Sequence, residues 1–405
     1  MSRADFLETL LDGVAVEWKS LGEITNVLRG KRLTKSQLSE EEKFPVYHGG
    51  LEPLGRYSDS NRAANTVMII NVGASAGTVG YSPVDFWSSD GCFCLEHNKL
   101  LNNRFLYFAL LGHQNVLRSR VRVAGIPTLD AIEVERLKIP IPSPEDQEKS
   151  LRIQAEIVRI LDAFTTHASE LTAELTARKK QYNYYRDQLL SFREGEVEWK
   201  PLGEIGEFIR GKRFTKADYV EVGVDVIHYG EIYTQYGVFT TRALSKVRGE
   251  MAETLRYAEP GDVVITDVGE TVEDVGKAVA WLGDEKVAIH DHCYAYRHSM
   301  NPKFVSYCMQ TTSFIAEKAK YVARTKVNTL LINGFAKIAI PVPHPNNPEK
   351  SLAEQARIVN ILDKFDALTT SISEGLPREI ELRQKQYEYY RDLLLSFPNP
   401  EEVAA

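Results

Sequence analysis

Hydrophobic residues recur at helical spacing along the middle of the chain. Between Ile153 and Phe192, the residues of one stripe follow each other at intervals of three or four positions, with a single stutter. This near-heptad pattern predicts a helix of about 45 residues whose stripe faces a partner helix. A second stripe runs from Ile358 to Phe397 and is interrupted at Gly375–Pro377. We expect a kink or break there, because proline suits the first turn of a new helix.

A segment of mixed character precedes each long helix. Its apolar runs are short and bounded by glycine, which predicts strands, for example at Val67–Ile70, Cys92–Leu95 and Leu137–Ile139. Helical spacing of apolar residues predicts a helix at 102–118. The segment ends in Ile139–Pro144, and the second one ends in Ile340–Pro343. Repeated proline excludes regular helix there and predicts an extended exit.

The sequence also repeats itself. Three segments of the first half return in the second half at offsets of 181, 201 and 205 residues: Val16–Ile24 as Val197–Ile205, Glu148–Leu151 as Glu349–Leu352, and Lys180–Asp187 as Lys385–Asp392. The offsets indicate one tandem duplication of a large unit, far longer than a solenoid repeat. A chain with two similar halves can mimic a symmetric dimer and suits a pseudo-two-fold partner.

Together these patterns predict a mixed fold, α+β in class. Two homologous α/β domains are separated by two long helices, which form an antiparallel intramolecular coiled coil with pseudo-two-fold symmetry. The predicted boundaries are 1–145 for the first domain, 146–196 for the central helical spacer, 197–347 for the second domain and 348–405 for the distal helical region.

Composition narrows the class of protein. The chain has 405 residues, of which 43% are hydrophobic, and no apolar run is long enough to span a membrane. Its start lacks a secretory signal, and its four cysteines have no C-x-x-C spacing. We therefore expect free thiols and a cytoplasmic location.

Charge is distributed unevenly, although the net charge is −7. No acidic residue lies between Glu96 and Asp130, and the only one between Asp291 and Glu349 is Glu317, whereas both stretches contain several lysines and arginines. Each half therefore combines a basic part with acidic helices, which is compatible with nucleic-acid binding despite the negative sum.

A basic motif occurs at the same place in each half, Arg29–Lys35 and Arg210–Lys216. A glycine among arginines and lysines can form a tight turn that presents guanidinium forks to guanine edges and ammonium groups to phosphates. A solvated turn is the alternative, but the recurrence favours function. From charge and repetition, the candidate DNA-binding residues are Arg29, Lys31, Arg32, Lys35, His48, Arg118, Arg120, Arg122, Arg210, Lys212, Arg213, Lys216, His228, Lys318, Lys320, Arg324 and Lys326.

Other motifs point away from catalysis. The glycine-rich Val72–Gly80 lacks the Gly-Lys-Ser/Thr ending of a phosphate loop, its counterpart Val268–Gly276 is acidic, and a hairpin turn is the better interpretation. His290 and His292 would share one face of a strand, but no second ligand pair stands nearby, so we expect no metal site. No hydrolase, metalloprotease or methyltransferase signature is present, and we expect no catalytic residues.

The two domain starts, the Gln-x-x-Ile-Val-x-Ile-Leu-Asp type segments 154–162 and 355–363, and the Tyr-rich helix ends resemble one known family. Along essentially its full length the chain is similar to the DNA-specificity subunit of type I restriction-modification systems. The tandem Glu-Leu-Thr-Ala at 170–177 is similar to the branch with tetrapeptide repeats in the central spacer helix. The resemblance implies two target-recognition domains, each reading half of a split target, on a chain that is itself non-catalytic.

The resemblance also implies partners. These are double-stranded DNA, two modification subunits that methylate adenine, and restriction/translocase subunits that complete the complex; S-adenosylmethionine, ATP and Mg would bind to those partner subunits. The duplicated helix ends give the candidate partner-binding residues Tyr184, Arg186, Asp187, Tyr389, Arg391 and Asp392. The rival hypothesis is a coiled-coil scaffold that binds only proteins. A stand-alone nuclease is disfavoured because no acidic metal cluster is apparent.

Overall fold

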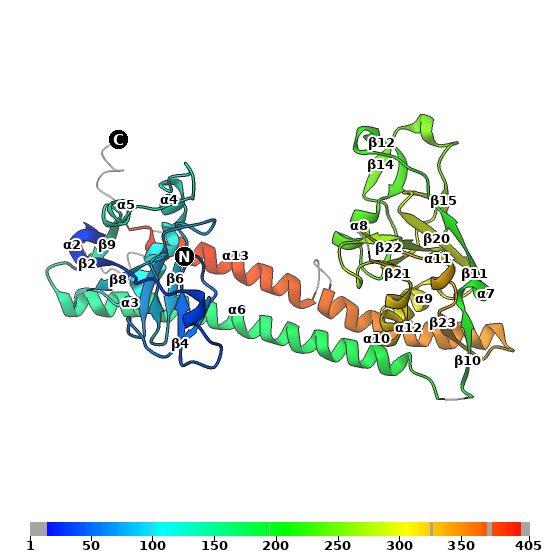
Figure 1. Cartoon of the computed structure of the whole chain (residues 1–405), viewed down its shortest axis with the longest axis horizontal. Helices are drawn as coiled ribbons and strands as arrows, with labels where there is room; N and C mark the ends of the chain where they lie inside the picture. Colours follow the sequence, from blue (N-terminus) through cyan, green and yellow to red (C-terminus); the bar gives the residue numbers. More distant parts are fainter. Residues whose placement is uncertain (1–13, 98, 194, 325–326, 371–374, 398–405) are drawn as a thin grey trace. The chain divides into compact units, whose positions relative to one another are not determined.

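The computed structural model describes residues 14–97, 99–193, 195–324, 327–370 and 375–397. The chain divides into two compact units, and each is described by itself (Figure 1). Unit 1 contains residues 1–170 and 380–405, and unit 2 contains residues 171–379. Each unit therefore holds one of the predicted domains together with parts of both helical regions. The predicted domain boundaries stay a prediction.

Unit 1 begins with a mixed domain. Its elements in chain order are β1 (Val16–Ser20), α2 (Leu21–Ile24), β2 (Thr25–Arg29), η1 (Lys35–Gln37), β3 (Phe44–Tyr47), β4 (Gly55–Tyr57), β5 (Thr66–Ile70), β6 (Val79–Ser82), β7 (Trp87–Ser88), β8 (Cys92–His97), α3 (Asn103–Gly112), α4 (Gln114–Ser119), α5 (Ala131–Glu135) and β9 (Lys138–Pro142). The main sheet has the order β2-β8-β5-β6, and its neighbours are antiparallel. The apolar run of β5 is central and buried, as such a run predicts.

Unit 2 repeats this plan with additions. Its elements are β10 (Val197–Pro201), α7 (Leu202–Ile205), β11 (Gly206–Arg210), η2 (Lys216–Asp218), β12 (Tyr219–Ile227), α8 (Tyr229–Thr234), β13 (Phe239–Thr240), β14 (Ser245–Val247), η3 (Gly249–Met251), β15 (Tyr257–Ala258), β16 (Val263–Thr266), β17 (Val268–Gly269), β18 (Ala278–Trp281), β19 (Val287–Ile289), β20 (Cys293–His298), α9 (Pro302–Cys308), α10 (Thr312–Lys318), η4 (Ala319–Tyr321), β21 (Val322–Ala323), β22 (Asn328–Leu330), α11 (Ile332–Phe335) and β23 (Ala339–Pro343). Its main sheet, β11-β20-β16-β18-β13, contains the counterpart of each strand in the sheet of unit 1.

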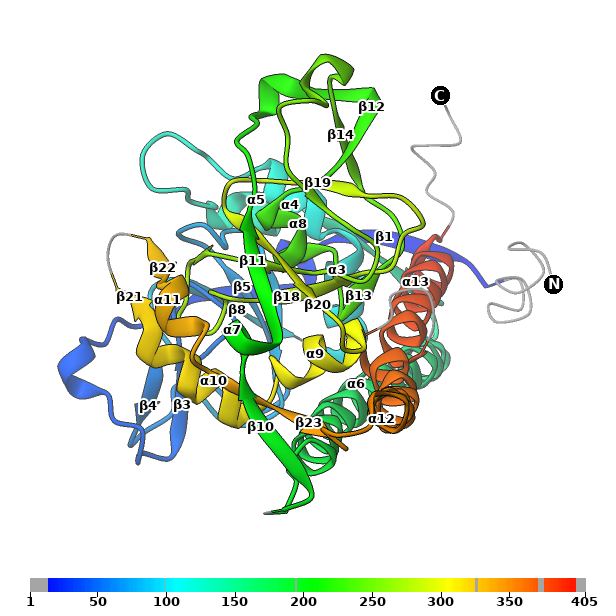
Figure 2. The same ribbon diagram turned by 90° about the vertical axis from the view of Figure 1, so that its right-hand side faces the viewer.

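The antiparallel ribbon of β12 and β14 is longer in unit 2 than its counterpart in unit 1. Its register shifts between Tyr219 and Val224, both of which pair with Val247. Both views show the ribbon extending away from the main sheet of its own unit (Figures 1 and 2). Unit 1 has the short ribbon of β3 and β4 in the corresponding place, so the two domains share a frame but differ in the length of this ribbon.

A two-stranded ribbon joins the start of each domain to its exit. β1 pairs with β9, and β10 pairs with β23, in matching antiparallel register. The prolines of β9, Pro140 and Pro142, stand opposite Trp18 and Val16. Alternate residues of such a ribbon point their N–H groups outward, so these prolines remove no ladder hydrogen bond. The predicted extended exits are confirmed, and each is a paired strand.

The helix predicted at 102–118 is wrong in one respect, since the structure has two helices, α3 and α4. His113 leaves the helical range (φ −100°, ψ 8°), and its Nδ1 lies 2.8 Å from the carbonyl oxygen of Ala109. Asn102 caps the start of α3 by accepting from the amides of Arg104 and Phe105. Periodicity located the apolar face but not the side chain that ends the first helix.

Three helices build the long helical regions: α6 (Gln147–Leu189), α12 (Pro348–Thr370) and α13 (Gly375–Leu395). In unit 1, Phe164 of α6 stacks on Tyr390 of α13 with ring centroids 5.1 Å apart. In unit 2, Tyr185 of α6 stacks on Phe365 of α12 at 5.5 Å. Figures 1 and 2 show α6 beside α13 in unit 1 and beside α12 in unit 2. Because the partner's number falls as α6 advances, the pairing is antiparallel, and the predicted fold class is confirmed.

The interruption of the second helical region falls where the sequence predicts it. α12 ends at Thr370 and α13 begins at Gly375, whose φ is +75°. A Cβ on Gly375 would lie 2.6 Å from the carbonyl oxygen of Ala367, so glycine is required by both conformation and space. No helix among the described residues is long and apolar enough to cross a membrane.

Candidate nucleic-acid interface

The repeated basic motif follows the first strand of each main sheet. Arg29 is the last residue of β2 and Arg210 the last residue of β11. A Cβ on Gly30 would lie 2.2 Å from the carbonyl oxygen of Ser89, and one on Gly211 would lie 2.0 Å from that of His290. Neither glycine has a positive φ. The predicted tight turn is therefore wrong: glycine is needed because two backbones approach closely.

The cations that follow each glycine are free to meet a ligand. Lys31, Arg32 and Lys35 in unit 1 are exposed, and so are Lys212, Arg213 and Lys216 in unit 2. Within the described part of the chain, none of these six side chains has a hydrogen-bond or ion-pair partner. In each unit, three cations without a partner among the described residues form a surface suited to phosphate groups.

We call the end of the sheet beside Arg210 the second arginine pole, defined by Arg210, Asp267, Asp291 and His292. Arg210 donates from Nε to the carbonyl oxygen of Asp291 at 3.1 Å, and Nη2 lies 3.1 Å from Oδ2 of Asp267. Nδ1 of His292 lies 3.0 Å from Oδ1 of Asp267, whose side chain is only 4% exposed. One buried carboxylate thus holds two exposed cationic or polar side chains.

The first arginine pole is the matching set in unit 1: Arg29, Asn71, Asp90 and Gly91. Arg29 donates from Nε to the carbonyl oxygen of Asp90 at 3.1 Å, as Arg210 does to Asp291. The amide N–H of Asn71 donates to the carbonyl of Gly91, and that of Asp267 to the carbonyl of His292. The backbones correspond, so Asn71 replaces Asp267 and Gly91 replaces His292.

Two loops border each pole. In unit 1, residues 71–78 connect β5 to β6 and meet the segment 122–128 through the bridge between Val72 and Thr128. In unit 2, β17 pairs with β22, which also pairs with β21. The glycine-rich segment of unit 1 is therefore a hairpin turn, as predicted. In unit 2 a cavity of about 860 Å³ lies among these elements and α8, with His292 in its wall.

The two histidine candidates differ in their environment. His228 caps α8, because its Nδ1 accepts from the amide of Gly230 at 3.1 Å. Burial, followed by the neighbouring His290, lowers the pKa of His228 to about 4, so the ring is neutral at physiological pH. His48 is half-buried, with Nδ1 3.4 Å from Oδ1 of Asp90. The geometry gives His228 a structural role in addition to any contact with DNA.

The basic C-terminal stretches are less free than their composition suggests. Arg120 donates to the carbonyl of Glu133 at 2.9 Å, Nη2 of Arg122 lies 3.8 Å from Asp130, and Arg118 lies 3.3 Å from the hydroxyl of Thr78. Asp130 and Glu133 lie just beyond the acid-free stretch and fold back on it. Local composition cannot reveal such pairing.

The DNA-binding candidates in the basic C-terminal stretch of unit 2 differ in exposure. Lys318 is only 2% exposed, and its Nζ donates to the carbonyl of Glu273 at 2.7 Å, so it is wrong as a surface DNA contact. Lys320 is exposed and pairs with Glu317. Arg324 is exposed, and Lys326 lies outside the described residues. Helical spacing places Lys318 on the inner face of α10, a signal that charge counting overlooks.

A buried glutamine fixes the start of each long helical region to its domain, and sequence reasoning missed it. Oε1 of Gln154 accepts from the amide of Asn102 at 2.8 Å, and Oε1 of Gln355 accepts from that of Asn301 at 2.8 Å. Ser150 and Ser351 hold the two glutamine amides. The repeated Ser-x-x-x-Gln spacing was the available signal. Part of the repeated sequence is therefore explained by packing inside the chain.

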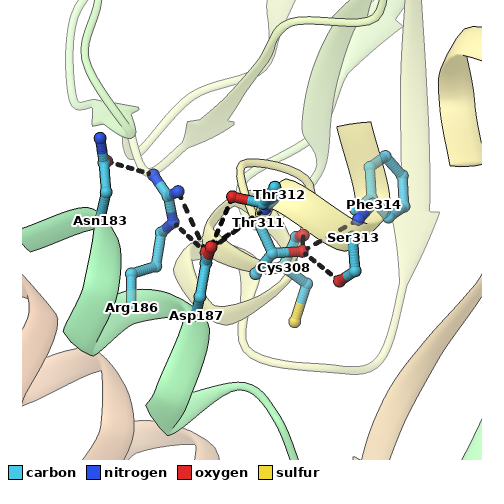
Figure 3. Close-up of polar contacts among 8 residues, drawn as sticks. All are labelled: Asn183, Arg186, Asp187, Cys308, Thr311, Thr312, Ser313 and Phe314. Carbon is cyan, nitrogen blue, oxygen red and sulfur yellow. Dashed lines mark hydrogen bonds and ion pairs between the residues drawn. The ribbon is translucent and has the colours of Figure 1, made fainter. Parts of the chain in front are cut away.

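The end of α6 is also fixed within unit 2 (Figure 3). Oδ2 of Asp187 accepts from the hydroxyl of Thr312 at 2.6 Å, and Oδ1 accepts from its amide at 3.3 Å. Arg186 is buried and pairs with Asp187 at 3.1 Å. The first copy of Arg-Asp thus has an explanation inside the chain, and its repetition no longer argues for a partner surface by itself. Arg391 pairs with Asp392, whose side chain is 65% exposed.

Tyrosines at the helix ends face two ways. Tyr182 and Tyr387 are buried, whereas Tyr184 and Tyr389 are 60% and 61% exposed. Tyr184 contacts Tyr185 at 5.4 Å, and Tyr389 contacts Tyr390 at 5.3 Å. The two exposed tyrosines therefore have matching surroundings and remain candidates for partner contacts.

Catalytic and metal chemistry find little support in the described residues. No group of three or more His, Cys, Asp or Glu side chains among them could hold a metal ion. His290 Nε2 lies 3.1 Å from the carbonyl oxygen of Phe214, and burial lowers the pKa of this histidine. All four cysteines are free and buried. Burial raises the pKa of each thiol, so none is poised as a nucleophile.

Comparison with protein families gives one model that matches the chain twice. The model described as type I restriction modification DNA specificity domain matches residues 14–178 and residues 194–382. The matches cover both domains and reach into both helical regions.

Individual proteins give the same result. The type I restriction enzyme EcoR124I/EcoR124II specificity subunit of Escherichia coli is 36% identical over 428 residues, with 100% of both chains covered. A putative type I restriction enzyme specificity subunit of Haemophilus influenzae is 31% identical, with 97% of this chain and 98% of that chain covered. In fold, the chain is similar to the crystal structure of a type I S subunit from M. genitalium, with TM-score 0.57, 18% identity, and 96% and 98% coverage.

Proposed function

We propose that this chain, which belongs to the family of type I restriction-modification DNA specificity subunits, reads one half of a bipartite DNA target with each of its two domains. It is the DNA-specificity subunit of a type I system and is itself non-catalytic. The observation that carries the proposal is the duplicated surface, in which an exposed arginine and three unpaired cations follow the same strand of each main sheet. Such a surface suits a duplex whose two half-sites lie on one axis.

The proposal is tested by binding of duplex DNA to the full chain assembled with its modification subunits. Affinity should fall steeply with salt, because contacts to phosphate release counterions. Mapping of the methylated adenines should give a split target. Binding that does not depend on salt, together with an absence of directed methylation, would favour the rival hypothesis of a protein-only scaffold.

Membership of the family implies DNA, modification subunits and restriction subunits as partners. We further propose that two modification subunits bind, one for each copy of the exposed tyrosine, Tyr184 and Tyr389. S-adenosylmethionine, ATP and Mg would be bound by those partners. Native mass spectrometry should show two modification subunits for each chain. A stable complex with one modification subunit at saturation would contradict this stoichiometry.

A double variant probes the tyrosine surface. Changing Tyr184 and Tyr389 to alanine removes exposed rings and leaves the stacked Tyr185 and Tyr390 in place. We expect weaker binding of both modification subunits with little change in unfolding temperature. A matched control changes the exposed Asn183 and Glu388 beside them to alanine. Equal affinity of the tyrosine variant and the control would remove these rings from the interface.

The Glu-Leu-Thr-Ala repeat at 170–177 is proposed to set the spacing between the half-sites, as in the branch with tetrapeptide repeats. Leu171 and Leu175 are half-buried, whereas Thr172 and Thr176 are exposed, so one more unit would preserve the inward stripe of α6. Four residues lengthen a helix by about 6 Å and turn it by about 40°. One base pair turns DNA by about 34° at roughly 10.5 base pairs per turn. We therefore expect one more base pair in the gap and unchanged half-sites.

Methylation mapping decides between these outcomes for a variant with a third repeat unit. A control insertion of the same length placed after Ser191, beyond the end of α6, should not lengthen the gap by a defined amount. An unchanged gap, or altered bases within a half-site, would show that α6 does not set the spacing between the half-sites.

A further inference from the structure

The guanidinium of Arg210 has one edge engaged and one edge free. Its Nε donates to the carbonyl oxygen of Asp291, and its Nη2 donates to Oδ2 of Asp267, both at 3.1 Å. These two donors form the side edge of the fork. The end edge consists of Nη1 and the second N–H of Nη2, and Nη1 has no hydrogen-bond partner in the part of the chain that the structure describes. Two parallel donors on a half-exposed side chain match O6 and N7 of guanine.

Asp267 fixes this geometry from inside the domain. Its side chain is 4% exposed, and its two oxygens lie 3.1 Å from Nη2 of Arg210 and 3.0 Å from Nδ1 of His292. A buried carboxylate is costly unless it is paired, so Asp267 retains its partners strongly. Arg210 and His292 are therefore oriented before any ligand arrives, which reduces the entropy lost on binding.

Unit 1 lacks such a buried carboxylate beside its arginine, although its backbone is equivalent. Asn71 stands in place of Asp267 and is 3% exposed. Its Nδ2 donates to the carbonyl of Asp90 at 3.3 Å, and its Oδ1 is buried without a hydrogen-bond partner among the described residues. Gly91 stands in place of His292, and a Cβ there would lie 2.7 Å from Nδ1 of His48. Two positions beside one retained arginine therefore differ together, as two half-sites of different sequence require.

The ion pair of Arg210 and the carboxylates near His292 favour base edges over phosphates. Glu270 and Asp274 line the cavity that also has His292 in its wall. These carboxylates repel phosphate, and the ion pair of Arg210 with Asp267 carries little net charge. A neutral pair contributes little to counterion release, yet it retains directional donors. Lys212 and Arg213, which are exposed and unpaired among the described residues, are better placed to contact phosphate.

We propose that Arg210, Asp267 and His292 form the base-reading centre of the second half-site. The free edge of Arg210 reads O6 and N7 of one guanine, His292 lies beside it on the same carboxylate, and Asp267 acts as a positioning residue that touches no DNA. This inference rests on the proposed function. It names the residues and the base, which the proposed function does not specify.

The test uses the full chain in complex with its modification subunits. Methylation mapping first gives the two half-sites of the wild type, and duplexes are then made with all four bases at each position in turn. For Arg210→Lys, which retains the charge but loses the fork, discrimination for guanine at one position of the second half-site should fall by about 5- to 150-fold. For Asp267→Asn, which introduces the residue of the first copy, it should fall by about tenfold. The first half-site should be unaffected in both variants.

A matched control distinguishes positioning from stability. Asp262 is a second buried carboxylate of the same domain, with a side chain 5% exposed, and it pairs with Arg297 at 2.9 Å. Asp262→Asn should lower stability as Asp267→Asn does, but it should leave every base preference unchanged. Should Asp267→Asn fail to fold, Arg210→Lys and His292→Gly alter only half-exposed side chains and still test the centre.

Undiminished preference for guanine in Arg210→Lys would overturn the assignment of the base reader. An equal base profile for Asp267→Asn and Asp262→Asn would overturn the role of Asp267. Failure of the proposed function is a separate result, because it would appear in the wild-type complex as a target that is not split. It would also appear as a change in the first half-site when only Arg210 is altered.

Discussion

The two domains agree in the contacts that hold each of them together and differ beside the arginines that we propose to contact DNA. Gln154 and Gln355 make the same hydrogen bond at the same length, and Gly30 and Gly211 allow the same close approach. At the arginine poles, Asn71 and Gly91 replace Asp267 and His292. Duplication thus preserved contacts that hold each domain together, while the residues beside each arginine diverged.

This contrast shows how to interpret repetition in such a chain. A repeated residue is not automatically a functional one, since Arg186 and Gln154 are repeated and buried. A residue that differs at an equivalent, ligand-facing position can carry more information about specificity. The following experiments test the two parts of this contrast, from the largest expected effect to the smallest.

The strongest test of the shared frame is Gly211→Ala, with Gly30→Ala as its equivalent. The new methyl group would lie 2.0 Å from the carbonyl oxygen of His290, or 2.2 Å from that of Ser89 in the first copy. Backbone must move, so we expect a loss of about 3 kcal/mol in the free energy of unfolding. Chemical denaturation measures it. Gly249→Ala is the control, because nothing lies within 4 Å of its new Cβ. If either variant kept the stability of the wild type, the two domains would not share the same close backbone approach.

Lys318→Met tests a basic residue that the fold has buried in only one copy. Burial lowers the pKa of Lys318 to about 8 from 10.5. The folded state therefore binds fewer protons than the unfolded state between these values, and wild-type stability rises with pH across that window. We expect the variant to be more stable at pH 7, and to lose about 3 kcal/mol of this advantage by pH 10.5. Lys337→Met, at an exposed position of the same domain, is the control. A difference that does not vary with pH would contradict the burial of the charge.

Gln154→Ala and Gln355→Ala test the paired anchors of the helices. Each variant leaves a half-buried amide of Asn102 or Asn301 without its acceptor, which should cost about 1 kcal/mol. Hydrogen exchange of that amide should accelerate only in the unit that carries the change. Gln188→Ala removes an exposed glutamine from α6 and should have no such effect. Acceleration in both units would mean that the anchors are not independent.

The smallest expected effect concerns phosphate contacts. Lys212→Ala and Arg213→Ala should each lower the slope of log affinity against log salt by about 1, as should Lys31→Ala and Arg32→Ala in the first copy. Lys318→Met should leave the slope unchanged, because that ammonium faces the interior. Titration of duplex binding with salt measures the slopes. If the salt slope fell only for the variants of one unit, the two cationic surfaces would have diverged, as the arginine poles have.

Sequence patterns predicted the elements that depend on local periodicity. The stripe of α6, the break before α13 and the extended exits follow from apolar spacing and from proline, and each is confirmed. The end of α3 at His113 was missed, because it depends on a side chain that contacts Ala109 in the folded chain. Apolar spacing shows where a helix forms, whereas its end can depend on a single side-chain contact that spacing does not reveal.

The candidate site was predictable in part for the same reason. Repetition and charge located Arg29, Arg210 and the cations that follow them. Asp267 and Asn71 were missed, because a lone acidic or amide residue between apolar strands gives no signal until the sheet brings it beside an arginine. Lys318 was included wrongly, since counting charges takes no account of the face of α10 on which it lies.

The prolines of the two ribbons have a consequence for assembly. β1 and β10 are nearly identical in sequence, and so each could pair with the exit strand of the other copy or of another molecule. The outward N–H positions of β9 include Pro140 and Pro142, and those of β23 include Pro341 and Pro343. An edge without these donors cannot template a further strand. A further strand therefore cannot add to the outer edge of β9 or β23 through these positions, which limits edge-to-edge joining of two chains on that side of each ribbon.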